Sequence, residues 1–444
     1  MVRIVPLLFL CAIAAYAAQS PGKAFPFAYD QTDLPNGLRL ITIPTEYPNV
    51  VSVYIVVQTG SRNEVEPGKS GFAHLFEHVM FRGTPKFPPA KYEATLKSIG
   101  AASNAYTTDD HTAYHTTFSK EDLETVLDME ADRFQNLRYP EQVFRTETLA
   151  VLGEYNKNSA NPLSKLFETV RDTAFDRHTY KHTTMGFLRD VEDMPNQYEY
   201  SKQFFARYYR PEYTTIVIAG DVTAETTRAL AAKYWGEWRR GDYQPEIPSE
   251  PAQTGARTKE IQWTTPTLPW VAVAFRGPAY SDETKDQAAL DIISYLGFSE
   301  SSELYQKLVI QEQKVDQLEA ESPDRVDPYL FAVLGRVKKE ADIEGVREAI
   351  VATADGFRND LVSAERLDAV KRHLRYAFAL QMNNSEAIAG SVARYVALRR
   401  TPETINRLYE VYDRITPEDV REAARKYLVA DGRTTVTLVG GKAK

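Results

Sequence analysis

The chain has 444 residues, of which 43% are hydrophobic and 26% are charged, with 53 basic and 61 acidic side chains and a net charge of −8. This length allows two or three domains with real cores, the 20 Phe and 26 Tyr exclude a disordered chain, and the acidic balance argues against nucleic-acid binding. The single cysteine, Cys11, excludes an internal disulfide, a cysteine-based zinc finger, an iron–sulfur cluster and a thiol nucleophile elsewhere.

Residues 1–18 have the pattern of a secretory signal peptide. A short basic start precedes an apolar run over 4–15, and Ala15-Tyr16-Ala17 offers a small-x-small cleavage site. The run is shorter than the roughly 20 residues that span a membrane. We therefore expect an exported protein without a membrane span, periplasmic if the source is bacterial. Loss of Cys11 with this peptide would leave only nitrogen and oxygen ligands for any metal.

The first half of the chain alternates strand and helix patterns. Residues 34–43 begin with an Asn-Gly turn and continue with strand alternation, and 50–57 form an apolar β-branched run typical of a buried strand. The further elements expected are helices at 71–81 and 92–99, a strand at 105–118, helices at 121–137, 141–158 and 162–175, a strand at 214–219 and a helix at 224–238.

The second half repeats this order after a proline-punctuated segment. Pro245, Pro248 and Pro251 mark a linker at 241–258. The patterns beyond it are a strand at 270–275, a helix at 285–296, a strand at 329–334, a helix at 343–357 and a strand at 434–439. We therefore expect an α+β fold of two homologous domains, 28–240 with the metal site and 259–444 without one, each an antiparallel or mixed β-sheet packed against helices.

The most informative motif is His74-Leu-Phe-Glu77-His78. Histidines four residues apart on a helix project from one face, which suits two nitrogen ligands on one Zn²⁺. Glu77 lies beside that face, where its carboxylate can take a proton from metal-bound water. The alternative is a pair of core histidines, but only seven histidines occur in the chain. The order His-x-x-Glu-His is the inverted zinc-protease signature.

A catalytic zinc also needs a third protein ligand and an open position. Glu147 and Glu154 lie seven residues apart on one face of an otherwise apolar helical run, which makes Glu154 a candidate. The histidines that remain as candidates are His111, His115, His178, His182 and His373. The pattern alone does not decide among them.

Several short segments accompany the His-x-x-Glu-His motif. They are Leu34-Pro-Asn-Gly-Leu38, Gly71-Phe-Ala-His-Leu-Phe-Glu-His78, Met80-Phe-Arg-Gly-Thr84, Asn104-Ala-Tyr-Thr107, Asp110-His-Thr-Ala-Tyr114, Tyr209-Arg-Pro-Glu212 and Gly220-Asp221. With them the chain resembles the pitrilysin family of zinc peptidases, the inverzincins, and in particular its small processing-peptidase-like members. The resemblance implies a zinc-dependent endopeptidase that cleaves peptides or unfolded segments inside a chamber closed by a second subunit.

The same resemblance assigns roles to residues outside the motif. The family's third zinc ligand is a Glu about 76 residues past the second His, which corresponds to Glu154 here. Glu147 corresponds to a carboxylate that holds a ligating imidazole by its other N–H. Asn104, Ala105 and Tyr106 correspond to a substrate-side strand, where an extended peptide adds to the sheet edge; an ordinary edge strand is the alternative. The histidines without an expected metal role are His111, His115, His178 and His182.

One departure from the family pattern lies in the second half. Family members place an Arg there, followed after several residues by a Tyr, and the pair binds substrate and stabilises the oxyanion. Residues 302–318 contain no Arg, and Val309 and Asp316 stand at the corresponding positions. We therefore expect a second pitrilysin-like subunit to supply the pair in a heterodimer, with a homodimer as the alternative.

Two other functions remain open. One is a non-catalytic assembly or scaffold subunit of the same fold, which the intact motif together with Glu154 disfavours, because a scaffold has no use for a water-activating Glu beside two ligands. The other is a processing peptidase in cofactor-peptide biosynthesis, which would use the same zinc site.

Overall fold

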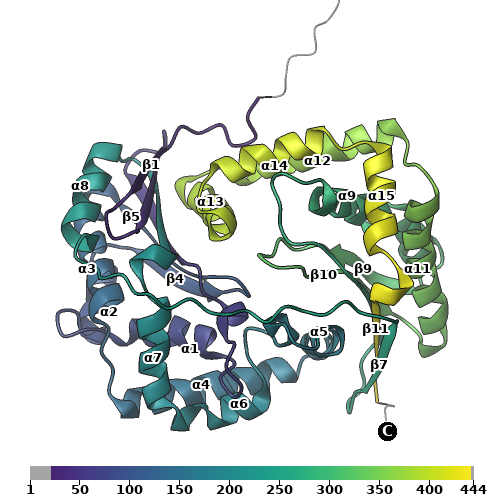
Figure 1. Ribbon diagram of the computed structural model, residues 1–444, viewed down its shortest axis with the longest axis horizontal. Helices are drawn as coiled ribbons and strands as arrows, with labels where there is room; N and C mark the ends of the chain where they lie inside the picture. Colours follow the sequence, from purple (N-terminus) through teal and green to yellow (C-terminus); the bar gives the residue numbers. More distant parts are fainter. Residues whose placement is uncertain (1–21, 442–444) are drawn as a thin grey trace, which may run out of the picture.

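Two β-sheets, one from each half of the chain, form the framework of the molecule (Figure 1). The computed structural model describes residues 22–441, so the expected signal peptide at 1–18 lies outside the described residues. The first sheet has the strand order β1-β2-β6-β3-β5-β4 and the second has the order β7-β11-β8-β10-β9. Each sheet contains one parallel pair, β2 with β6 and β7 with β11, among antiparallel ones. The expected α+β fold with mixed sheets is confirmed.

The two sheets share one topology. The strands of the first are β1 (Asp30–Asp33), β2 (Arg39–Pro44), β3 (Val50–Val57), β4 (Ala102–Thr107), β5 (Thr112–Ser119) and β6 (Thr214–Gly220). Those of the second are β7 (Arg257–Gln262), β8 (Trp270–Arg276), β9 (Val315–Glu321), β10 (Leu330–Val337) and β11 (Arg433–Val439). The order β2-β6-β3-β5-β4 matches β7-β11-β8-β10-β9 in sequence and in strand direction. Such a match is what an internal duplication produces.

Helices follow the strands in both halves. Those of the first half are α1 (Phe72–Val79), α2 (Pro89–Ser98), α3 (Leu123–Asn136), α4 (Glu141–Ser159), α5 (Pro162–Ala174), α6 (Leu188–Asp193), α7 (Tyr198–Tyr208) and α8 (Ala224–Trp235). Those of the second are α9 (Asp286–Phe298), α10 (Glu303–Tyr305), α11 (Ile343–Asn359), α12 (Ala364–Gln381), α13 (Ser385–Arg399), α14 (Glu403–Asp413) and α15 (Pro417–Tyr427). None of these described helices is both long and apolar enough to cross a membrane.

The prediction of a single strand over 105–118 is wrong, because this segment belongs to a hairpin of two strands, β4 and β5. β4 and β5 pair antiparallel around a turn at 108–111, with Thr107 opposite Thr112. β4 forms the edge of the sheet, since its described hydrogen-bonded neighbour is β5 alone. The hairpin therefore presents an open strand edge beside α1, which packs against β4.

The central strands of each sheet are buried on both faces. Along β3, Val51, Val53 and Ile55 pack with the helices of the first half, whereas Tyr54 and Val56 point into a core shared with the second half. The alternation follows from the two-residue period of a strand. Burial of both faces explains why the sequence of 50–57 is a nearly continuous apolar run.

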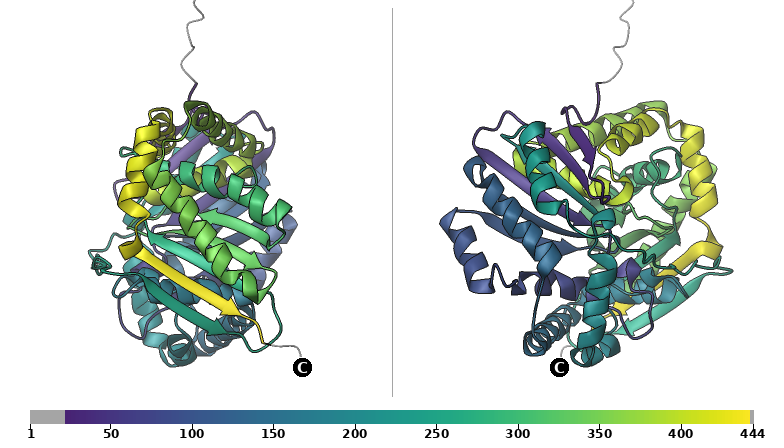
Figure 2. Two further views of the ribbon diagram at one scale, coloured as in Figure 1. Left: turned by 90° about the vertical axis from the view of Figure 1, so that its right-hand side faces the viewer. Right: turned by 60° about the vertical axis from the view of Figure 1, so that its left-hand side comes forward.

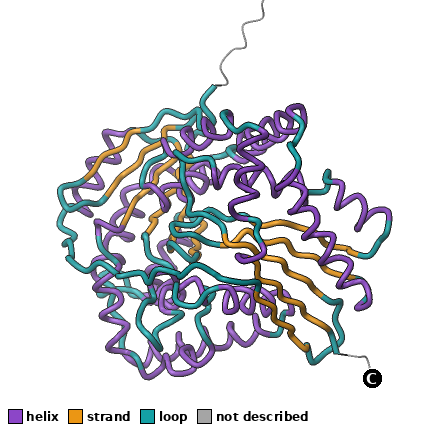
Figure 3. Tube along the Cα trace, turned by 45° about the vertical axis from the view of Figure 1, so that its right-hand side comes forward, coloured by secondary structure: helices purple, strands orange, loops and turns teal. Residues whose placement is uncertain are grey.

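The halves exchange helices across their boundary. α13 of the second half packs on β3 and β6, and α5 of the first half packs on β11, β7 and β8. Leu166 and Val170 of α5 join the apolar face of the second sheet. Figure 2 shows the second sheet between its layers of helices, and Figure 3 shows the two groups of strands with helices between and around them. Each half thus completes the core of the other.

Residues 238–256 carry neither helix nor strand and cross from the first half to the second (Figure 1). β7 begins at Arg257, inside the segment expected as linker. Glu250 fixes this crossing, because its carboxylate accepts the N–H groups of Asp176, Arg177 and His178 and pairs with Arg276 at 2.7 Å.

Candidate metal centre

The helix that carries the His-x-x-Glu-His motif is fixed at its start by a buried carboxylate. Glu64 accepts the N–H groups of Gly71 and Ala73, each at 2.7 Å, and so satisfies two donors that a helix N-terminus leaves open. Gly71 has φ of 93°, in the left-handed region that favours glycine. The apolar face is anchored by Phe76, which stacks on Phe204 at 5.2 Å between ring centroids. These contacts therefore fix the orientation of helix α1 about its own axis.

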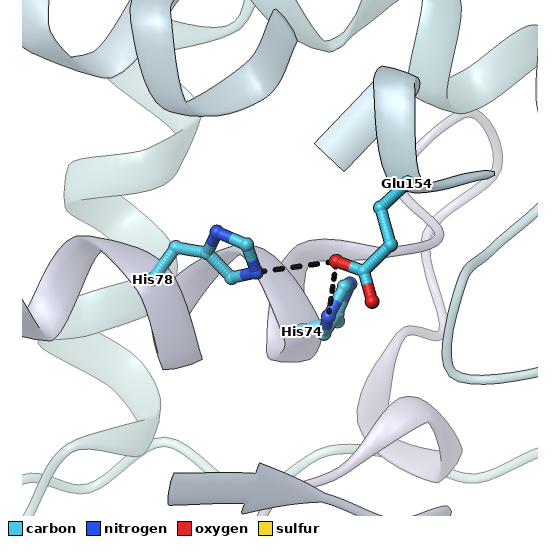
Figure 4. A group of neighbouring side chains, drawn as sticks. All are labelled: His74, His78 and Glu154. Carbon is cyan, nitrogen blue, oxygen red and sulfur yellow. Dashed lines mark ion pairs between the residues drawn. The ribbon is translucent and has the colours of Figure 1, made fainter. Parts of the chain in front are cut away.

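Three side chains converge beside α1 (Figure 4). The Nε2 atoms of His74 and His78 each lie 3.6 Å from Glu154 Oε2, which α4 brings across from the neighbouring helix. Their donor atoms all lie within 4.8 Å of one another, and within residues 22–441 no other group of three or more His, Cys, Asp or Glu side chains does so. The structure thus brings Glu154 to the two histidines of α1, and none of the remaining five histidines joins them.

The donor set fits a zinc ion. Ligand atoms 2.0–2.1 Å from one tetrahedral Zn²⁺ are roughly 3.4 Å apart, close to the 3.6 Å that separates Glu154 Oε2 from each imidazole. Burial, then the neighbouring His78, lowers the pKa of His74 to about 4, so its imidazole is neutral near pH 7, as a ligand must be. His74 Nδ1 is buried and has no hydrogen-bond partner among the described residues.

Glu147 lies about two turns before Glu154 on the same face of α4 and is near the other ring nitrogen of His78. Its Oε2 is 3.8 Å from His78 Nδ1, and its Oε1 is 2.8 Å from Nε of Arg82. The Glu147 side chain is only 8% exposed. Burial tends to raise its pKa, but His78 and Arg82 outweigh burial, so the pKa lies below its ordinary value. In return Glu147 raises the pKa of His78.

Glu77 lies close enough to His78 and Glu154 for their charges to act on it, and its carboxylate contacts the β4–β5 hairpin. Its Oε2 accepts a hydrogen bond of 2.7 Å from the hydroxyl of Thr107, the last residue of β4. Burial raises the pKa of Glu77, and the Thr107 hydroxyl offsets part of that rise. A carboxyl with a raised pKa is suited to proton transfer near neutral pH.

The expected substrate-side residues lie on the sheet edge next to α1. Asn104 is exposed, and its side chain accepts the N–H of Ala105 at 2.9 Å. Ala105 is buried against α1, and Tyr106 meets the ring of His111 edge-on at 5.6 Å. The strand therefore shows an open backbone edge close to Glu77.

The remaining histidines lie apart from this centre. His111 closes the β4–β5 turn through Thr108, and His115 stacks on Tyr54 at 4.7 Å. His178 accepts the N–H of Tyr180 and donates to Asp327 across the boundary between halves. His182 and His373 contact Thr183 and Tyr295 respectively.

The stretch at 302–318 contains no Arg, and its two lysines, Lys307 and Lys314, pair with Glu312. Val309 lies in a short π-helix at Gln306–Gln311 and packs on the apolar core. Asp316 is on β9, where it pairs with Arg336 of β10 at 2.8 Å. The guanidinium of Arg336 is thus paired within its own sheet.

Three functional contacts were not inferred from the sequence. Glu64, Arg82 and Thr107 act on α1, Glu147 and Glu77 respectively. Arg82 and Thr107 lie within the short segments that accompany the motif, so the sequence could have marked them as candidates. It could not have identified the residues that they contact. Nothing in the pattern around Glu64 distinguishes it from a surface acid.

Comparison with known proteins places this geometry in a family. A model described as insulinase (peptidase family M16) matches residues 39–187, and a model described as the peptidase M16 inactive domain matches 197–374. The zinc protease PqqE of Helicobacter pylori is 28% identical over 417 residues, with 92% of each chain covered. A probable mitochondrial-processing peptidase subunit beta of Arabidopsis thaliana is 25% identical over 426 residues, covering 92% of this chain and 78% of the relative. The crystal structure of a protease from Helicobacter pylori superposes with a TM-score of 0.86 at 28% identity, covering 93% of this chain and 99% of that one.

Proposed function

The chain belongs to peptidase family M16, and from this membership and the geometry beside α1 we propose that it is a zinc-dependent endopeptidase acting on peptides or unfolded segments. The matches to both family models confirm the family resemblance inferred from the motifs. M16 peptidases are metallopeptidases that use zinc. The observation that carries the proposal is the convergence of His74, His78 and Glu154 with Glu77 beside them.

His74, His78 and Glu154 would hold one zinc ion, and Glu147 would hold the imidazole of His78 from its other nitrogen. When bound, zinc supplies a Lewis acid that polarises the scissile carbonyl and lowers the pKa of a water molecule toward 7. Glu77 would take the proton of the attacking water and then pass it to the leaving amine.

The open edge of β4 would position the substrate. A peptide that adds to this edge as a further strand receives main-chain hydrogen bonds whatever its side chains are, and Asn104, Ala105 and Tyr106 supply that backbone. This arrangement suits an enzyme of loose sequence preference. It also places the docked peptide next to the Glu77 carboxylate, because Thr107 of the same strand contacts it.

We further propose that a second pitrilysin-like subunit closes the chamber and provides the Arg/Tyr pair, because Val309 and Asp316 occupy the corresponding positions here. The name of one relative, a processing peptidase subunit beta, describes it as one subunit of an assembly. A heterodimer fits best, because Val309 and Asp316 would recur in a second copy of this chain. Full peptidase activity of the purified chain as a homodimer would rule this part out.

The test is hydrolysis of a quenched fluorescent peptide by the full chain, alone and mixed with candidate partner chains. We expect hydrolysis that a chelator abolishes and added zinc restores. Absence of both zinc and hydrolysis in every combination would instead support the scaffold function. The proposed site of action, the periplasm if the source is bacterial, is tested separately by cell fractionation and by the N-terminal sequence of the mature chain.

A further inference from the structure

We propose that Thr107 is a positioning residue for the reaction, because its hydroxyl sets the orientation of the Glu77 carboxylate. The inference rests on the proposed function, in which Glu77 is the general base. Thr107 Oγ1 donates to Glu77 Oε2 at 2.7 Å, and it is the one side-chain donor to Glu77 within residues 22–441. The bond is made to one carboxylate oxygen, Oε2, and so restricts the orientation of the whole carboxylate.

Glu77 needs such a partner because its own helix does not fix its side chain. α1 is held firmly through Glu64 and through the stacking of Phe76 on Phe204. These contacts place the backbone of Glu77, but the side chain beyond it has three rotatable bonds and is only partly buried. A general base must lie within hydrogen-bond reach of its proton, so a donor that selects one rotamer favours the reactive geometry.

Thr107 is suited to this task because its own position is rigid. It ends β4 and pairs with Thr112 of β5. The turn that follows is closed by a hydrogen bond of 2.8 Å from Thr108 N–H to His111 O. Asp109, two residues after Thr107, is 2% exposed and is held by Arg171 at 2.6 Å and Arg325 at 2.9 Å. The backbone of Thr107 is thus held by the strand pairing on one side and by the turn on the other.

The arrangement couples two tasks in one strand. Asn104 to Tyr106 offer the backbone edge on which a peptide would dock, and the next residue orients the base. A fixed distance along β4 therefore separates the docked peptide from the carboxylate. Since a misplacement of about 1 Å can cost roughly 100-fold in rate, this spacing matters for turnover more than for binding.

The test compares three variants in the full chain, in whichever assembly gives wild-type hydrolysis. Thr107→Val keeps the β-branched shape that a strand favours and removes only the hydroxyl. We expect kcat to fall about 10- to 100-fold, with KM and zinc content unchanged. Thr107→Ser keeps a hydroxyl and restores most of kcat. Thr116→Val, which removes the hydroxyl that bonds Ser103 in the same hairpin, leaves kcat as in wild type.

A double variant tests whether Thr107 acts on the rate through Glu77. In the Glu77→Gln background the Thr107→Val change has no further effect on the residual rate, because the residue acts only through Glu77. The inference is overturned if Thr107→Val retains wild-type kcat, if only KM changes, or if Thr116→Val is equally impaired. A wild-type chain without chelator-sensitive hydrolysis overturns the proposed function itself, and with it this inference.

Discussion

Glu147 shows how one side chain in this site serves two neighbours. Its Oε2 accepts a hydrogen bond of 3.0 Å from Arg82 Nη2 and also faces His78 Nδ1, while its Oε1 lies 2.8 Å from Arg82 Nε and the side chain is only slightly exposed. Arg82 keeps the carboxylate charged, since together with His78 it lowers the Glu147 pKa against the effect of burial. A charged carboxylate behind an imidazole fixes the tautomer and makes the opposite nitrogen a better ligand. His74 has no such partner, as its Nδ1 has none among the described residues.

We predict that Glu147→Gln weakens zinc binding by about 10- to 100-fold without unfolding the chain. The amide cannot carry the charge that orients His78, and it leaves Arg82 without its ion pair. Competition against a fluorescent chelator measures the affinity. Glu141→Gln is the matched control, because Glu141 lies on the same helix and pairs only with the exposed Arg145. Equal zinc affinity for both variants would show that Glu147 has no part in holding the metal.

At the scale of elements, α1 and α4 were predictable because their patterns are local. Their helical periods place His74 with His78 and Glu147 with Glu154, and the structure keeps both pairs on facing sides. The β4–β5 hairpin gave only a weak signal, because Asp109 and Asp110 favour a turn but no Gly or Pro marks 108–111. That turn depends instead on Asp109, whose partners Arg171 and Arg325 are 62 and 216 residues away in sequence.

We predict that Asp109→Asn lowers the free energy of unfolding by about 3–5 kcal/mol at pH 7, because it removes the counter-charge of the buried Arg171 and of the partly buried Arg325. Arg171 and Arg325 hold the pKa of Asp109 well below its ordinary value, although burial opposes them. The carboxylate therefore contributes its full stability above about pH 4 and loses it as the pH falls toward the folded-state pKa. Wild type and variant should accordingly converge in acid.

Urea unfolding at several pH values measures this difference. Asp242→Asn is the control, because Asp242 is exposed in the segment between the halves. A difference that stays constant from pH 7 to about pH 3 would contradict the assignment of the effect to the charge of Asp109.

At the scale of the whole molecule, the duplication is visible in the sequence but its consequence is not. The shared strand order follows from the repeated apolar runs, such as 50–57 and 270–275. The exchange of α5 and α13 between halves could not be read from the pattern, because an apolar helix face is the same whichever sheet covers it. The second half thus stabilises the β4–β5 turn and the core behind the site without contributing a metal ligand among the described residues.

Much of the candidate site follows from local spacing, and the rest from contacts that only the fold creates. His74, Glu77 and His78 lie within one helix, so their relation is set by helical geometry. Glu154 required the family resemblance, because seven-residue spacing alone does not say which helix packs on α1. Thr107 and Glu64 contact the motif from other elements, and their contributions depend on tertiary packing.

The most direct test of the central claim is the zinc content of two variants, Glu154→Gln and Glu77→Gln, beside wild type. We predict one zinc per chain in wild type and in Glu77→Gln, with hydrolysis reduced to a small residual rate in the latter, since Glu77 moves a proton and holds no metal. Glu154→Gln should lose the zinc, because the amide replaces the single carboxylate that faces both imidazoles. Full zinc in Glu154→Gln, or loss of zinc in Glu77→Gln, would contradict this assignment of the site.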